Sequence, residues 1–219
     1  RMVRTALTRE TWEATNECWI ELKLALSKRV KPADMPEVIG TIKRCTALIR
    51  GAFHGTMLRD DIYNFSRIGT FIERADNTAR ILDVKYYVLL PAIAKVGSSL
   101  DNKQWESILR SVSAHRSYSW VYDGDYSSTN ISDFLILNDR MPRSLAYSYD
   151  KIVSNLGYLA KLYGDNHAAH ETASATLMLL RSRTIDDIME QGLHEFIEEF
   201  IVHNNRLGEE ISDGYRFYR

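Results

Sequence analysis

Residues that interrupt helices are scarce in this chain. Only 4 prolines and 11 glycines occur among its 219 residues, so few positions can end a helix or form a tight turn. Residues of high helix propensity, such as leucine, alanine, glutamate, lysine and arginine, are plentiful. No segment shows the sustained alternation of apolar and polar residues that is typical of a strand. The sequence therefore predicts an all-α protein, a bundle of about six to eight helices.

The spacing of the apolar residues indicates where these helices lie. They recur at steps of three and four residues, which places them on one face of each helix. We expect helices over about residues 8–28, 37–51, 60–90, 99–122, 131–137, 142–163, 168–183 and from 184 to at least 205. No low-complexity linker divides the chain, so we expect a single domain over residues 1–219.

Composition and charge exclude several classes of partner and location. The formal net charge is −1 at pH 7, whereas a nucleic-acid-binding protein usually carries a clear basic excess. No apolar run approaches the roughly 18 residues of a membrane span, and no signal peptide is recognisable, so we expect a cytoplasmic protein. The two cysteines, Cys18 and Cys45, are too few for a disulfide scaffold. We expect both to be buried, reduced thiols.

The predicted helix over residues 60–90 is the most polar, and we expect it to be long and central. Its apolar residues gather on one side, and a separate stripe includes Glu73, Asn77 and Arg80. If the helix is central, these groups are buried and form either a hydrogen-bonded network or a pocket for an anionic or amide-bearing ligand. A solvated face is the third interpretation. Asp76 and Arg80 are four residues apart and can pair along the helix.

The segment Phe65–Val84 resembles the signature of the bacterial Alpha-E family, a helical group named for its Glu-Arg motif. Here the motif is Glu73-Arg74, within the run Glu-Arg-Ala-Asp-Asn-Thr-Ala-Arg. The resemblance extends over essentially the whole chain. Family members usually carry an earlier copy of the motif on an N-terminal helix, which this sequence lacks. The resemblance therefore implies that the chain is a fragment, the C-terminal two thirds of a member.

The resemblance also implies partners. Alpha-E proteins are commonly encoded beside ATP-grasp-type ligases and transglutaminase-like or peptidase-like proteins. The implied function is that of an accessory or partner protein in the synthesis or modification of a peptide or amide-linked metabolite, without a cofactor and without catalysis of its own. The alternative is an enzyme or ligand-binding protein with a polar site on the Glu-Arg helix, in which Glu73 is the acid or base and Arg74 or Arg80 holds a carboxylate. A helical interaction module is a third hypothesis.

Two further pairs of residues are candidates for an anion site. His115 and Arg116 are adjacent on a predicted helix, and together they could hold an anion. Their serine neighbours do not complete a Ser-His dyad, because successive side chains on a helix point about 100° apart. Arg140 and Arg143 flank Pro142 where a helix is expected to start, and they could form an anion cradle. Helix capping is the alternative interpretation of that segment.

The sequence does not predict a metal site. A di-metal site in a helical bundle needs Glu-x-x-His motifs on two helices. Glu190 and His194 are four residues apart, as are Glu199 and His203, so neither pair has that spacing.

Overall fold

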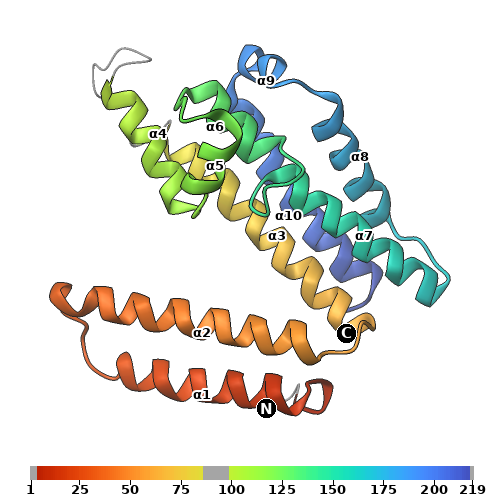
Figure 1. The fold of residues 1–219 in the computed structure, drawn as a ribbon. Helices are drawn as coiled ribbons and strands as arrows, with labels where there is room; N and C mark the ends of the chain where they lie inside the picture. Colours follow the sequence, from red (N-terminus) through yellow and green to blue (C-terminus); the bar gives the residue numbers. More distant parts are fainter. Residues whose placement is uncertain (1–3, 86–98, 218–219) are drawn as a thin grey trace. The chain divides into compact units, whose positions relative to one another are not determined.

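The computed structural model describes residues 4–85 and 99–217, and helices dominate both ranges (Figure 1). No β-strand occurs within these ranges, which confirms the all-α prediction. The described residues form ten α-helices, more than the six to eight expected. They are α1 (Arg9–Ala25), α2 (Met35–Thr56), α3 (Asp61–Val84), α4 (Ser99–Ser111), α5 (His115–Tyr122), α6 (Ser128–Ile136), α7 (Leu145–Tyr163), α8 (Ala168–Ser182), α9 (Ile185–Gln191) and α10 (Leu193–Gly214).

The chain divides into two compact units, with the boundary between Tyr63 and Asn64. The first unit contains α1 and α2. The second contains nearly all of α3 and the helices α4 to α10. The expectation of a single domain over residues 1–219 stays a prediction, because compactness does not measure whether the two units unfold in one transition.

Helices α1 and α2 form an antiparallel hairpin (Figure 1). The buried residues between them are small, namely Thr11, Ala14 and Cys18 on α1, and Thr41 and Cys45 on α2. Small side chains let two helices approach closely, since the distance between helix axes depends on the residues at the contact. The thiol of Cys18 donates to the backbone carbonyl of Cys45, with 3.6 Å from sulfur to oxygen. Both cysteines are free and buried, as the sequence predicts.

We expect the thiol of Cys45 to react slowly in the folded protein. A hydrogen bond with Cys18 and burial raise the pKa of Cys45 to about 11, so very little thiolate is present at pH 8. The rate of labelling by Ellman's reagent should rise steeply when denaturant unfolds the hairpin. A Cys45→Ala variant gives the signal of Cys18 alone, and its difference from the wild type assigns the rest to Cys45. Rapid labelling of two thiols per wild-type chain without denaturant would contradict this expectation.

The second unit has one continuous apolar core. Helix α8 packs against α7 and α10, and α9 packs against α6 and α10, while α3 runs alongside α10 (Figure 1). Helix α3 buries the apolar face that its sequence predicts. Its buried apolar residues are Ile68, Phe71, Ala75, Ala79 and Leu82. This face holds α3 in the unit and leaves its other sides available for polar contacts.

Two predicted helices are interrupted in the structure. The helix expected over residues 99–122 ends at Ser111 and restarts at His115, because Ser113 adopts a left-handed backbone conformation with φ 55°. The last predicted helix is also two helices, separated by Gly192 with φ 107°. Glycine adopts such a φ without a steric cost, so this position ends α9 and redirects the chain into α10. The predicted end of the third helix near residue 90 lies outside the described residues.

A buried asparagine joins three helices of the second unit. Asn204 on α10 is fully buried. Its Nδ2 donates to the carbonyl of Ile72 on α3 at 3.1 Å, and its Oδ1 accepts from the hydroxyl of Tyr149 on α7, also at 3.1 Å. These hydrogen bonds fix the position of α10 against α3 and α7.

Candidate functional site

The polar stripe of α3 is exposed. The side chains of Glu73, Asn77 and Arg80 all face solvent, so the expectation that they are buried is wrong. The physical reason is that the apolar residues of α3 form its buried face, and the stripe points away from them. The predicted pair does form, with Arg80 Nε 2.7 Å from Asp76 Oδ2. A role of these residues in ligand binding stays a prediction.

The arginine of the Glu-Arg motif connects α3 to the turn that precedes α7. Arg74 is half-buried, and its Nη1 donates to the carbonyl of Pro142 at 3.1 Å. One turn further along α3, the hydroxyl of Thr78 donates to the carbonyl of Arg143 at 2.8 Å. The turn thus contacts α3 through its backbone carbonyls. Arg74 therefore has a structural role that the sequence alone did not reveal.

The segment predicted as an anion cradle forms a capped helix start. The side chain of Arg140 is exposed and that of Arg143 is half-buried. Helix α7 begins at Leu145, and the hydroxyl oxygen of Ser144 accepts a hydrogen bond from the amide of Tyr147 at 3.0 Å. This cap satisfies one of the amides that an anion would otherwise bind, which favours the capping interpretation.

His115 and Arg116 do not form a joint site. His115 Nε2 lies 2.9 Å from Glu106 Oε1 and 3.0 Å from the hydroxyl of Tyr126, and its ring stacks on that of Tyr126. The side chain of Arg116 is exposed, and its guanidinium lies 5.9 Å from the centre of the Trp120 ring. The two neighbours thus contact different groups, as expected for adjacent residues on a helix.

Because the polar stripe is exposed, we expect substitutions in it to change stability little. Glu73→Ala should alter the free energy of unfolding by no more than about 0.5 kcal/mol. Arg80→Ala should cost up to about 1 kcal/mol, the upper end for a solvent-exposed pair. Thermal unfolding measures both effects, at roughly 2–4 °C for each kcal/mol in a protein of this size. A fall of ten degrees or more in both variants would contradict the exposed placement.

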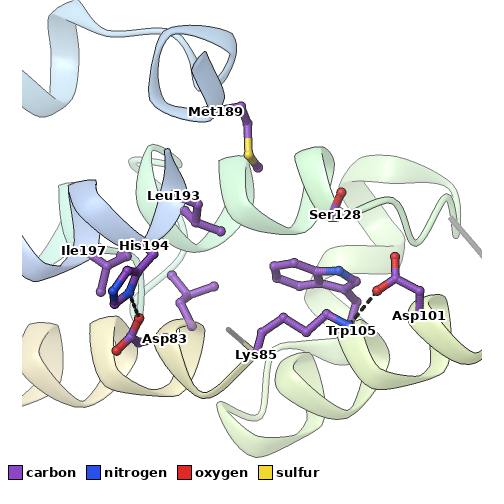
Figure 2. Close-up of a pocket in the computed structure, with 10 residues that line it drawn as sticks. Asp83, Lys85, Asp101, Trp105, Ser128, Met189, Leu193, His194 and Ile197 are labelled. Carbon is purple, nitrogen blue, oxygen red and sulfur yellow. Dashed lines mark hydrogen bonds and ion pairs between the residues drawn. The ribbon is translucent and has the colours of Figure 1, made fainter. Parts of the chain in front are cut away.

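A pocket of about 200 Å³ lies within the second unit, where the end of α3 meets α4, α9 and α10 (Figure 2). Most of its wall is apolar, and charged groups occur at a few points. The lining residues are Leu82, Asp83, Lys85, Asp101, Trp105, Ser128, Met189, Leu193, His194 and Ile197. None of the site residues proposed from the sequence belongs to this set. An apolar recess with a few polar groups is the usual form of a small-molecule site, so this pocket is the candidate functional site.

One charged pair of the pocket joins α4 to the residue after α3. Lys85 is 8 % exposed, and its Nζ lies 2.5 Å from Asp101 Oδ1 and 2.5 Å from Gln104 Oε1. The ammonium also lies 5.7 Å from the centre of the Trp105 ring. A buried ammonium needs such partners, because burial removes it from water. The pair therefore depends on the correct placement of α4.

The second charged pair of the pocket joins α3 to α10. His194 Nδ1 lies 2.7 Å from Asp83 Oδ1, and His194 Nε2 lies 3.6 Å from Glu198 Oε2. The hydrogen bond that His194 donates to Asp83 raises the pKa of His194 above its ordinary value, and burial opposes this effect in part. Figure 2 shows this pair on one side of the pocket and the Lys85–Asp101 pair on the other.

The raised pKa of His194 predicts a pH-dependent contribution to stability. Because the folded protein holds the proton more tightly than the unfolded chain, this contribution is fully present below the unfolded pKa of about 6.5. It is lost as pH rises through the folded pKa. We therefore expect His194→Gln to destabilise the protein more at pH 6 than at pH 8.5, as measured by urea unfolding. The exposed His203→Gln is the matched control, and an equal loss at both pH values would contradict the assignment.

Together, the fold and the pocket define an all-α bundle protein with a small, mostly apolar recess flanked by paired charges. The chain belongs to the Alpha-E family, described as a predicted alpha-helical domain with a conserved ER motif, whose model matches residues 1–215. The match covers essentially the whole chain, and the expectation that the chain is the C-terminal two thirds of a member stays a prediction. No curated protein and no solved structure matches the chain.

Two findings concern other kinds of site. Among residues 4–85 and 99–217, no helix is both long enough and apolar enough to cross a membrane. Within the same ranges, no group of three or more histidine, cysteine, aspartate or glutamate side chains is placed to hold a metal ion. Glu190 and Glu199 are exposed, and His194 is engaged by Asp83.

Proposed function

We propose that this protein is a non-catalytic binding protein that holds a small amide-bearing molecule, or one residue of a peptide, in the pocket at the end of α3. It acts in the bacterial cytoplasm as an accessory protein of an ATP-grasp-type ligase, with transglutaminase-like proteins as further partners. The pocket is the observation that carries the proposal. The family resemblance supplies the class of metabolism and the partners.

The residues that line the pocket support ligand binding over catalysis. Most of its wall is apolar, with Leu193 and Met189 among the lining residues, and such a wall binds by excluding water. The basic groups in its lining, Lys85 and His194, are each held by a carboxylate. Groups fixed in this way are suited to orienting a ligand by hydrogen bonds.

Filling the pocket should abolish ligand binding. Leu193→Trp introduces a large side chain at the pocket wall, and the exposed Leu162→Trp on α7 is its matched control. Binding of a panel of blocked amino acids and dipeptides is measured by saturation-transfer NMR. We expect signals with the wild type and with the control, and none with Leu193→Trp. Equal signals from all three proteins would place binding outside the pocket and contradict the proposal.

The partnership with a ligase requires a separate experiment. The protein is expressed together with a candidate ATP-grasp-type ligase and purified through a tag on one of them. We expect the two to purify together and the ligase turnover to change when the binding protein is added. Separate elution with unchanged turnover would remove the ligase from the proposal and leave the pocket experiment unaffected.

A further inference from the structure

Each basic side chain in the pocket wall is paired with a carboxylate that also belongs to the wall. The ammonium of Lys85 is held by the carboxylate of Asp101 and the amide oxygen of Gln104, both at 2.5 Å. The imidazole of His194 is held by the carboxylate of Asp83 at 2.7 Å. The four charged side chains of these two pairs are only 9–16 % exposed. Water therefore does little to solvate any of them if its partner is taken away.

This arrangement disfavours a ligand with a net charge. An anion that accepts a hydrogen bond from Lys85 is repelled by the carboxylate of Asp101, which lies 2.5 Å from the same ammonium. A cation that donates to Asp83 meets a carboxylate that already pairs with His194. In each case the ligand brings an extra charge into a mostly apolar recess whose own charges are already paired, and taking such a charge out of water is costly.

An uncharged amide avoids this conflict because it carries a hydrogen-bond donor and an acceptor. A carboxylate oxygen can accept more than one hydrogen bond, so Asp83 or Asp101 can accept from an amide N–H while keeping its cation. The hydroxyl of Ser128, at the first residue of α6, can rotate to donate to an amide carbonyl. An amide thus adds hydrogen bonds to the two ion pairs and breaks neither.

The apolar wall of the pocket determines which side chain the ligand can carry. Its side chains are Leu82, Trp105, Met189, Leu193 and Ile197, and the pocket volume is about 200 Å³. That space suits one branched aliphatic or aromatic group. The thioether side chain of Met189 is flexible and can adjust to its shape.

We propose that the pocket selects an uncharged amide that bears one apolar side chain, and that it rejects the anionic and cationic forms of the same molecule. This inference rests on the proposed function of the pocket as a ligand site. It specifies in addition that the ligand is uncharged. A residue inside a peptide has this chemistry, whereas a free amino acid does not.

Four probes that share the leucine side chain test whether the pocket prefers an uncharged ligand. N-acetyl-leucinamide is neutral, N-acetyl-leucine is an anion, leucinamide is a cation and leucine is a zwitterion. Dissociation constants come from chemical-shift titration of the full chain at pH 7. We expect the neutral probe to bind at least tenfold more tightly than each charged probe. A charged probe that binds as tightly as the neutral one would overturn the inference and leave the pocket as a ligand site. No binding of any probe would contradict the proposed function and the inference together.

A change of wall charge should change the preference. Asp101→Asn removes the carboxylate from Lys85, so N-acetyl-leucine should gain at least about tenfold in affinity relative to N-acetyl-leucinamide. Asp101→Ala removes the same carboxylate and serves if the first variant does not fold, as judged by circular dichroism. The exposed Asp139→Asn is the matched control and should leave the preference unchanged. An unchanged preference in a folded pocket variant would overturn the inference.

Discussion

Replacing Lys85 by methionine should lower the free energy of unfolding by about 3–5 kcal/mol. Lys85 is nearly buried, and its ammonium is the cation held by Asp101 and Gln104 at the base of the pocket. Methionine matches the length of the lysine stem but leaves the carboxylate of Asp101 without its counter-charge. Urea unfolding followed by circular dichroism measures the change. A loss below 1 kcal/mol would show that the pair is solvated and would contradict the buried geometry.

Two further variants separate the ion pair from other effects of this substitution. Lys103→Met changes the same residue type at an exposed position of α4, and we expect an effect within about 0.5 kcal/mol. The double variant Lys85→Met/Asp101→Leu removes both charges. It should be much closer to the wild type than Lys85→Met alone, because replacing a whole buried pair by apolar residues is often neutral.

Replacing Asn204 by leucine should lower the free energy of unfolding by about 2–4 kcal/mol. Leucine has a similar volume but cannot hydrogen-bond, so the carbonyl of Ile72 loses a donor and the hydroxyl of Tyr149 loses an acceptor in the core. Thermal and urea unfolding measure the loss. The exposed neighbour Asn205→Leu is the matched control, with an expected effect within about 0.5 kcal/mol.

A double-mutant cycle tests the mechanism of the Asn204 effect. Tyr149→Phe removes one side of the hydrogen bond, and the combination with Asn204→Leu removes both. The cost of the double variant should be smaller than the sum of the two single costs, with a coupling of at least 0.5 kcal/mol. Strict additivity would show that the two residues stabilise the fold independently.

Helix positions followed from the sequence because each helix has its own apolar periodicity. The predicted helix over residues 168–183 is α8 (Ala168–Ser182), and the predicted buried face of α3 is confirmed at Ile68, Phe71 and Leu82. The breaks were harder to predict. Serine rarely adopts a positive φ, so Ser113 carries no signal of a break, whereas Gly192 is of the residue type that adopts it most readily.

The candidate site could not be read from the sequence for a different reason. Periodicity shows which residues share a face of one helix, but it does not show which faces meet. The interpretation of Glu73, Asn77 and Arg80 as a buried network requires neighbours on all sides of α3, whereas this face of α3 is exposed. The pocket depends instead on pairs such as Asp83 with His194, whose proximity is set by the packing of α3 against α10.

Asp83 and His194 are 111 positions apart in the chain, which has a consequence for the order of events in the cell. A ribosome adds roughly 5–20 residues per second, so about 5–20 s separate the synthesis of these two residues. During that interval α3 exists without the helix that closes its pocket. On the proposed function, a ligand can bind only once α10 has packed against α3, because Leu193 and His194 of α10 form part of the pocket wall.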